Sequence, residues 1–137
     1  MAEEVVATFK GPLNSFSINL TVKNDSKSDI RMFGISGRTA KFPVTWDNFG
    51  AFAGPATLTS TVGLDTEVVV QRFSNFNPNE TVDFNGIDPD FTGDVSSGVR
   101  VLDIEGSRAV VIFSDGESGF GEFEVNDNGE LQAILTK

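Results

Sequence analysis

The sequence contains no cysteine and no histidine. The absence of cysteine excludes disulfides, thiolate metal ligands and a thiol nucleophile. The absence of histidine excludes Ser-His-Asp triads and removes the commonest general base and the commonest zinc ligand. Twenty acidic residues still allow many carboxylate pairs, but no pair has a spacing that sets it apart as the two acids of a glycosidase. We therefore expect a protein that is not an enzyme.

Long apolar runs are also missing. No stretch approaches the roughly 20 apolar residues that a membrane-spanning helix needs, so no membrane span is expected. Residues 1–10 carry Glu3 and Glu4 and lack the basic start and apolar stretch of a signal peptide. The pattern therefore predicts no signal peptide in the sequence given.

Positive charge is scarce, because ten Lys and Arg face twenty Asp and Glu and leave a net charge of −10. Residues 1–72 are balanced, with seven acids and seven bases, whereas residues 73–137 hold thirteen acids and three bases. An acidic surface repels nucleic acid, so we expect no nucleic-acid partner. It suits a cationic protein partner or divalent cations, and it is also what a plain solvated surface looks like.

What is present is a two-residue hydrophobic rhythm. Over residues 16–23, Phe16, Ile18, Leu20 and Val22 alternate with polar residues, which is typical of a strand with one buried face. A length of 137 residues suits one domain over residues 1–137. No stretch has a convincing helical period.

Further strands are predicted along the whole chain. Residues 67–73 contain three consecutive valines, which indicate a central strand buried on both faces. Residues 36–56 are expected to form short strands around a long loop. The other predicted strands are 30–35, 57–62, 81–84, 99–104, 108–113, 119–125 and 130–136. Asp-Gly and Asn-Gly turns between the last of these favour an antiparallel meander. The fold class is therefore all-β, as an antiparallel two-sheet β-sandwich or, less favoured, a barrel.

Two short segments resemble the immunoglobulin-like sandwich modules found on bacterial cell surfaces and in phage particles. The segment Ile18–Ser26, INLTVKNDS, is similar to an early strand that ends in an Asn-containing turn. The segment Phe76–Val82, FNPNETV, resembles a Pro-Gly-Glu-Ser/Thr turn, with Asn79 where glycine is usual. Asparagine tolerates the left-handed conformation that such a position requires. The resemblance implies an immunoglobulin-like fold and no particular function.

The best candidate metal site is the segment 86–94, GIDPDFTGD. Asp88, Asp90 and Asp94 would present hard oxygen ligands from a loop bent by glycine and proline, so Ca²⁺ is the cofactor we consider. The alternative is that these aspartates cap turns through their own backbone. No other cofactor is expected.

A ligand-binding site is considered at Trp46, Asp47 and Phe49. Flat aromatic rings beside polar groups are what carbohydrate binding needs. The sequence has one Trp and no Tyr, and the alternative is that Trp46 is a core anchor.

Basic residues come closest to a cluster at Arg31, Arg38 and Lys41. They would form one pole of a charge dipole that meets the acidic surface of a neighbouring molecule. We therefore expect a non-catalytic structural or interaction protein that belongs to a larger assembly, such as a phage decoration protein. Its partners would be copies of itself or a capsid or surface protein, on a virion or an extracellular surface. The alternative is a secreted or cell-surface binding module, linked to carbohydrate or calcium.

Overall fold

The computed structural model describes residues 4–92 and 98–137. Strands hold 57% of the residues and helix 3%, and the strands pair antiparallel. The expected all-β, antiparallel class is confirmed. The strands are β1 (Glu4–Lys10), β2 (Ile18–Asn24), β3 (Ile30–Ser36), β4 (Val44–Asn48), β5 (Ala51–Ala53), β6 (Thr57–Val62), β7 (Val68–Phe76), β8 (Thr81–Phe91), β9 (Arg108–Phe113), β10 (Ser118–Glu122), β11 (Glu124–Val125) and β12 (Leu131–Thr136).

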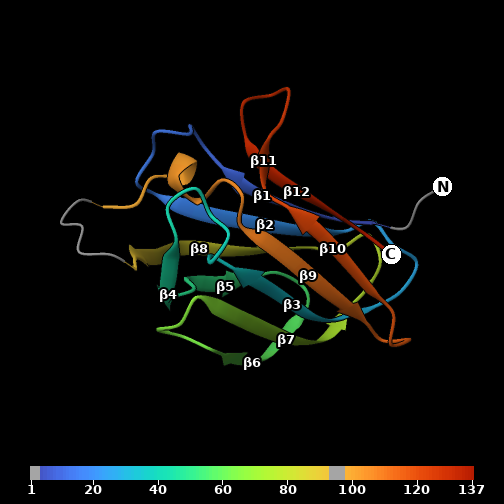
Figure 1. The fold of residues 1–137 in the computed structure, drawn as a ribbon. Helices are drawn as coiled ribbons and strands as arrows, with labels where there is room; N and C mark the ends of the chain where they lie inside the picture. The colour runs from blue at the N-terminus through green and yellow to red at the C-terminus, as the bar shows by residue number, and fades with distance from the viewer. Residues whose placement is uncertain (1–3, 93–97) are drawn as a thin grey trace.

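The strands form one continuous sheet that curls into a half-barrel. Its hydrogen-bonded order is β4-β8-β2-β1-β12-β10-β9-β3-β7-β6, with β5 beside β8 and β11 beside β12. In Figure 1 the sheet runs from β6 at the bottom through β7, β3, β9 and β10 to β12, β1 and β2. The continuous order leaves the expected two-sheet immunoglobulin-like sandwich unconfirmed.

The two ends of this sheet meet at β4. The Trp46 amide donates a hydrogen bond to the Thr66 carbonyl, and the Asp65 amide donates to the Trp46 carbonyl, both at 2.9 Å. The Trp46 indole Nε1 donates to the Glu67 carbonyl at 2.9 Å. The connection between β6 and β7 therefore lies along the outer edge of β4 and satisfies the backbone N–H and carbonyl of Trp46.

The concave side of the sheet encloses one hydrophobic core. Alternate residues of β2, namely Ile18, Leu20 and Val22, are fully buried, as the two-residue rhythm predicts. Phe16 was predicted on the same face, but β2 begins after it and its ring is 65% exposed. The largest fully buried side chains are Trp46, Phe9, Phe33, Phe76, Phe84, Phe113 and Phe123.

The expected strand over residues 99–104 is wrong, because Val101–Ile104 forms a 3₁₀-helix, η1. Asp103 decides this local structure. Its carboxylate accepts a hydrogen bond from the Arg100 amide at 2.9 Å and pairs with the Arg100 guanidinium at 3.3 Å. A side chain that caps the backbone locally competes with strand pairing. Val101 and Ile104 are still buried, so the apolar pattern is used with a different period.

Strand β1 is not among the strands predicted above, although Val5, Ala7 and Phe9 alternate and are fully buried. It lies between β2 and β12 and pairs with both. At the turn before β8, Asn79 has a φ of 70°, as expected for an asparagine in a glycine-like position.

Candidate functional site

The outward side chains of five neighbouring strands form a row across the convex face of the sheet. Val62 of β6 lies opposite Val70 of β7, and Val70 lies opposite Gly34 of β3. Gly34 lies opposite Val110 of β9, which lies opposite Phe120 of β10. We call these five residues the apolar row. They are far apart in the sequence and are aligned only by the strand register.

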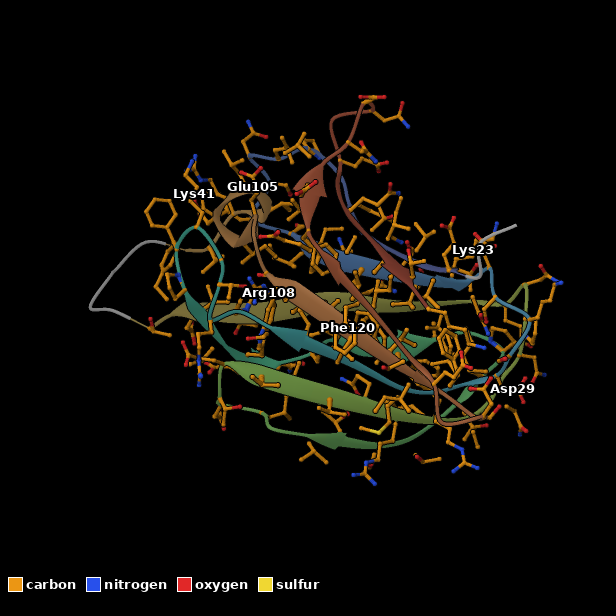
Figure 2. The ribbon with its side chains drawn as sticks, turned by 45° about the vertical axis from the view of Figure 1, so that its right-hand side comes forward. Lys23, Asp29, Lys41, Glu105, Arg108 and Phe120 are labelled. Carbon is orange, nitrogen blue, oxygen red and sulfur yellow. The ribbon has the colours of Figure 1, made fainter. Side chains whose placement is uncertain are left out.

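Large apolar side chains on this face are open to solvent. Phe120 is 67% exposed and Val62 is 52% exposed, at opposite ends of the apolar row. Val68 of β7, 42% exposed, and Ile134 of β12, 49% exposed, extend the surface to either side. Phe120 is labelled on this face in Figure 2. Contiguous exposed apolar surface marks sites where a protein or a ligand binds.

The expectation that residues 67–73 are buried on both faces is wrong. Val69 points into the core and is fully buried, whereas Val68 is exposed and Val70 is half-buried. The reason is that the core covers only the concave side of β7. The valine run therefore indicates the apolar convex face and not a second buried layer.

A shallow depression of about 320 Å³ lies within this face, over Gly34 and beside Phe120. A Cβ at Gly34 would lie 3.2 Å from Val110 Cγ1 and 3.5 Å from Val70 Cγ2, so the two valines flank a floor of bare backbone. The remaining lining is Ile35, Ser36, Val68, Arg108 and Ala109. The lining of the depression is mostly apolar, and its one charged residue is Arg108.

Two opposite charges lie next to the apolar row. Arg108 of β9 and Glu122 of β10 are direct cross-strand partners and line a common groove with Phe120. Both are exposed, and within residues 4–92 and 98–137 neither makes an ion pair. Figure 2 labels Arg108 and Phe120 on neighbouring strands. Two free charges of opposite sign are available here to a partner.

A larger groove of about 580 Å³ adjoins the row at the far end of β3 and β9. Met32 and Ile112 form part of its wall, one outward position along from Gly34 and Val110. Its charged lining is Asp29, Arg31 and Arg72. Among the described contacts neither arginine makes an ion pair.

Comparison with known proteins gives no identification. No family model matches the chain, and neither a curated protein nor a solved structure matches it. Function is therefore argued from the surface chemistry alone. In the part of the chain that the structure describes, no helix has the length and apolar character to cross a membrane.

The three basic residues predicted to cluster are not brought together. Arg31 lies near the start of β3, and Arg38 follows its end, about 20 Å away at the usual rise of a strand. Figure 2 shows Lys41 at the opposite end of the molecule from Asp29, which directly precedes β3. Arg38 pairs with Glu67 at 3.2 Å, and the Lys41 ammonium lies 5.9 Å from the Phe42 ring centroid. Arg31 lines the larger groove together with Arg72.

The predicted aromatic platform is not at the surface. Trp46 is fully buried and Phe49 is 3% exposed, and their rings pack edge-to-face with centroids 5.7 Å apart. Of the two interpretations of Trp46, the burial supports the core anchor. Asp47, the third residue of that candidate site, is exposed on β4.

The predicted calcium-binding loop is strand as far as Phe91, because β8 continues through Asp88 and Asp90. Asp88 lies opposite Asn48 and Asp90 lies opposite Thr45 on β4. Asp94 lies outside the described residues. Within the described ranges, no group of three or more Asp or Glu side chains is arranged to hold a metal ion.

Asp47 has an unusual environment beside these aspartates. A hydrogen bond with the Asp90 carboxyl, followed by desolvation and by the charges of Asp90 and Asp65, raises the pKa of Asp47 from 3.8 to about 6. Two carboxylates this close favour sharing one proton. This proximity follows from the pairing of β4 with β8 and from the connection after β6 that lies against β4.

Proposed function

We propose that this protein is a non-catalytic interaction protein that binds a protein partner through the convex face of its sheet. It would act as a component of a larger assembly, such as the surface of a phage particle or of a bacterial cell. The observation that carries the proposal is the apolar row with Phe120, 67% exposed, at its end. An aromatic side chain in such a position is the kind of residue that anchors protein interfaces.

The energetics favour a covered face. Moving one large apolar side chain from water into an interface contributes roughly 1.5–3 kcal/mol. Phe120, Val62, Val68 and Ile134 are between 42% and 67% exposed, so covering each of them yields roughly half of such a contribution. Arg108 and Glu122 supply a polar margin that adds orientation more than affinity.

A carbohydrate- or calcium-linked binding module has less support. Its aromatic platform would need exposed rings, and Trp46 and Phe49 are buried. Its calcium loop would need a bent segment, and the chain is extended through Asp88 and Asp90.

We retain an immunoglobulin-like relationship as a proposal about the fold. The segments that carry the resemblance form β2 with its turn and the turn that leads into β8. In the first turn, the Asn24 side-chain Nδ2 donates to the Ser28 carbonyl at 2.9 Å. In the second, the Asn77 amide donates to the Glu80 carboxylate at 2.7 Å. In both turns a side chain hydrogen-bonds to the backbone and fixes the connection between strands.

The proposal is tested by photo-crosslinking in the native source. A benzoyl-phenylalanine replaces Phe120 in one variant and Phe16 in another. Phe16 is 65% exposed but lies in the connection between β1 and β2, so it is a matched control for exposure. We expect a covalent protein adduct from position 120 that is absent from position 16.

An adduct at both positions in equal yield, or at neither, would contradict the proposal. Mass spectrometry of the adduct identifies the partner and shows which face is covered. Adducts formed within one chain are separated from intermolecular products by their mass.

A further inference from the structure

We propose that the partner on the apolar row is a second copy of this chain, bound face to face about a two-fold axis. The inference rests on the proposed function and specifies its partner. A two-fold interface places the same patch on both sides, so the patch must be complementary to itself. The apolar row and its margin satisfy that condition in shape and in charge.

Shape complementarity comes from Phe120 and the depression over Gly34. Phe120 projects into solvent, and the depression of about 320 Å³ lies beside it on the same face. A two-fold axis that lies in the interface plane, between β9 and β10 and parallel to them, places the Phe120 ring of each copy on Val110 of the other, at the edge of the depression. A Cβ at Gly34 would already lie 3.2 Å from Val110 Cγ1 and 3.5 Å from Val70 Cγ2, so an incoming ring packs on top of the two valines and not between them.

Charge complementarity comes from Arg108 and Glu122. They are neighbours on β9 and β10 at the margin of the row, and neither has an ion pair within the described residues. In a two-fold pair, Arg108 of each copy faces Glu122 of the other. A patch with one cation and one anion side by side fits its own copy better than a partner of a single charge sign.

The size of the face sets the expected strength. Five strands about 4.8 Å apart give a width of about 24 Å, and about five residues per strand give a length of about 17 Å. The resulting area, about 400 Å², is smaller than the roughly 800 Å² per partner of a stable interface. We therefore expect a reversible dimer with a dissociation constant in the micromolar range.

The experiment is sedimentation velocity of the purified full chain from about 1 µM to about 1 mM. Wild-type protein is expected to move from the 14.7 kDa chain mass to twice that mass as concentration rises. Phe120→Asp is expected to stay monomeric over this range. Phe16→Asp, which adds the same charge at an exposed phenylalanine outside the face, is expected to dimerise as the wild type does.

Charge exchange gives the sharper test. Arg108→Glu copies carry two acids at the margin and repel each other, and Glu122→Arg copies carry two bases and do the same. Each variant alone is expected to dimerise at least about tenfold more weakly. An equimolar mixture of the two is expected to recover dimers, because each acid then faces a base. A general folding defect would not be rescued by mixing.

Wild-type protein that remains monomeric up to about 1 mM would overturn the inference, as would a mixture that recovers nothing. A monomer that still crosslinks from position 120 to a different protein would leave the proposed function standing and replace the partner. A monomer that also forms no adduct at position 120 would overturn both proposals.

Discussion

At the residue scale, Asp47 shows how tertiary neighbours change the chemistry of a side chain. The sequence places it beside Trp46, which suggests a ligand platform, but the fold places its carboxyl against Asp90 and Asp65. Its raised pKa follows from that contact and from partial desolvation. The titration is a property of the strand pairing between β4 and β8.

The raised pKa predicts a specific pH dependence. Between the ordinary aspartate pKa of 3.8 and the folded-state pKa of about 6, the folded protein holds a proton at Asp47 that the unfolded chain has lost. The contribution of Asp47 to stability is therefore present at low pH and is lost as pH rises through about 6. Asp47→Asn should gain stability relative to wild type over that rise, measured by thermal unfolding across the window.

Asp127→Asn is the matched control, because it removes the same charge from an exposed turn residue. The difference in thermal stability between Asp127→Asn and wild type should change less over the same pH range. Equal pH profiles for the two variants, or an NMR titration of the Asp47 carboxyl near its ordinary value, would contradict the expected contact with Asp90.

At the scale of single elements, the two-residue rhythm is a reliable guide to faces and a poorer guide to boundaries. It predicts the buried face of β2 and the positions of β3, β6 and β9. It predicts a strand where η1 forms, because the hydrogen bonds of the Asp103 cap are local and leave no periodic pattern in the sequence. It also cuts β8 short, since the glycine and proline after Phe84 suggest a bend, whereas pairing with β4 keeps the segment extended.

Packing between elements predicts the most damaging single substitution. The Phe84 ring of β8 is 1% exposed and lies 5.1 Å from Phe49, 5.5 Å from Phe52 and 6.3 Å from Phe73, measured between centroids. Phe84→Ala should therefore lower the free energy of unfolding by about 3–5 kcal/mol. Phe16→Ala, at an exposed ring, should lower it by no more than about 0.5 kcal/mol. Urea unfolding of both variants measures the difference, and similar losses would contradict the packing described.

At the scale of the whole molecule, net charge opposes self-association. Two copies of charge −10 with centres about 30 Å apart repel by about 14 kcal/mol in water without salt. Exposed ion pairs such as those between Arg108 and Glu122 contribute at most about 1 kcal/mol each. The repulsion is the larger effect, and it is also the more strongly screened by salt because it acts at longer range.

Salt should therefore strengthen the dimer. Raising ionic strength from about 10 mM to about 150 mM shortens the screening length from about 30 Å to about 8 Å. The dissociation constant, followed by sedimentation equilibrium, should fall over this range. A dissociation constant that rises with salt would mean that the ion pairs between Arg108 and Glu122 dominate the affinity. That result would contradict the apolar row as the source of affinity.

The sequence by itself determined the all-β class and the inward face of most strands, and its lack of histidine and cysteine excluded several catalytic chemistries. Alternation suffices for this because it is a local property of each strand. Only the tertiary structure decided that Val62, Val70, Gly34, Val110 and Phe120 lie in one row. A two-residue period indicates which side of the sheet a residue points to. It does not indicate which strands are neighbours or in what register they pair, and the surface depends on both.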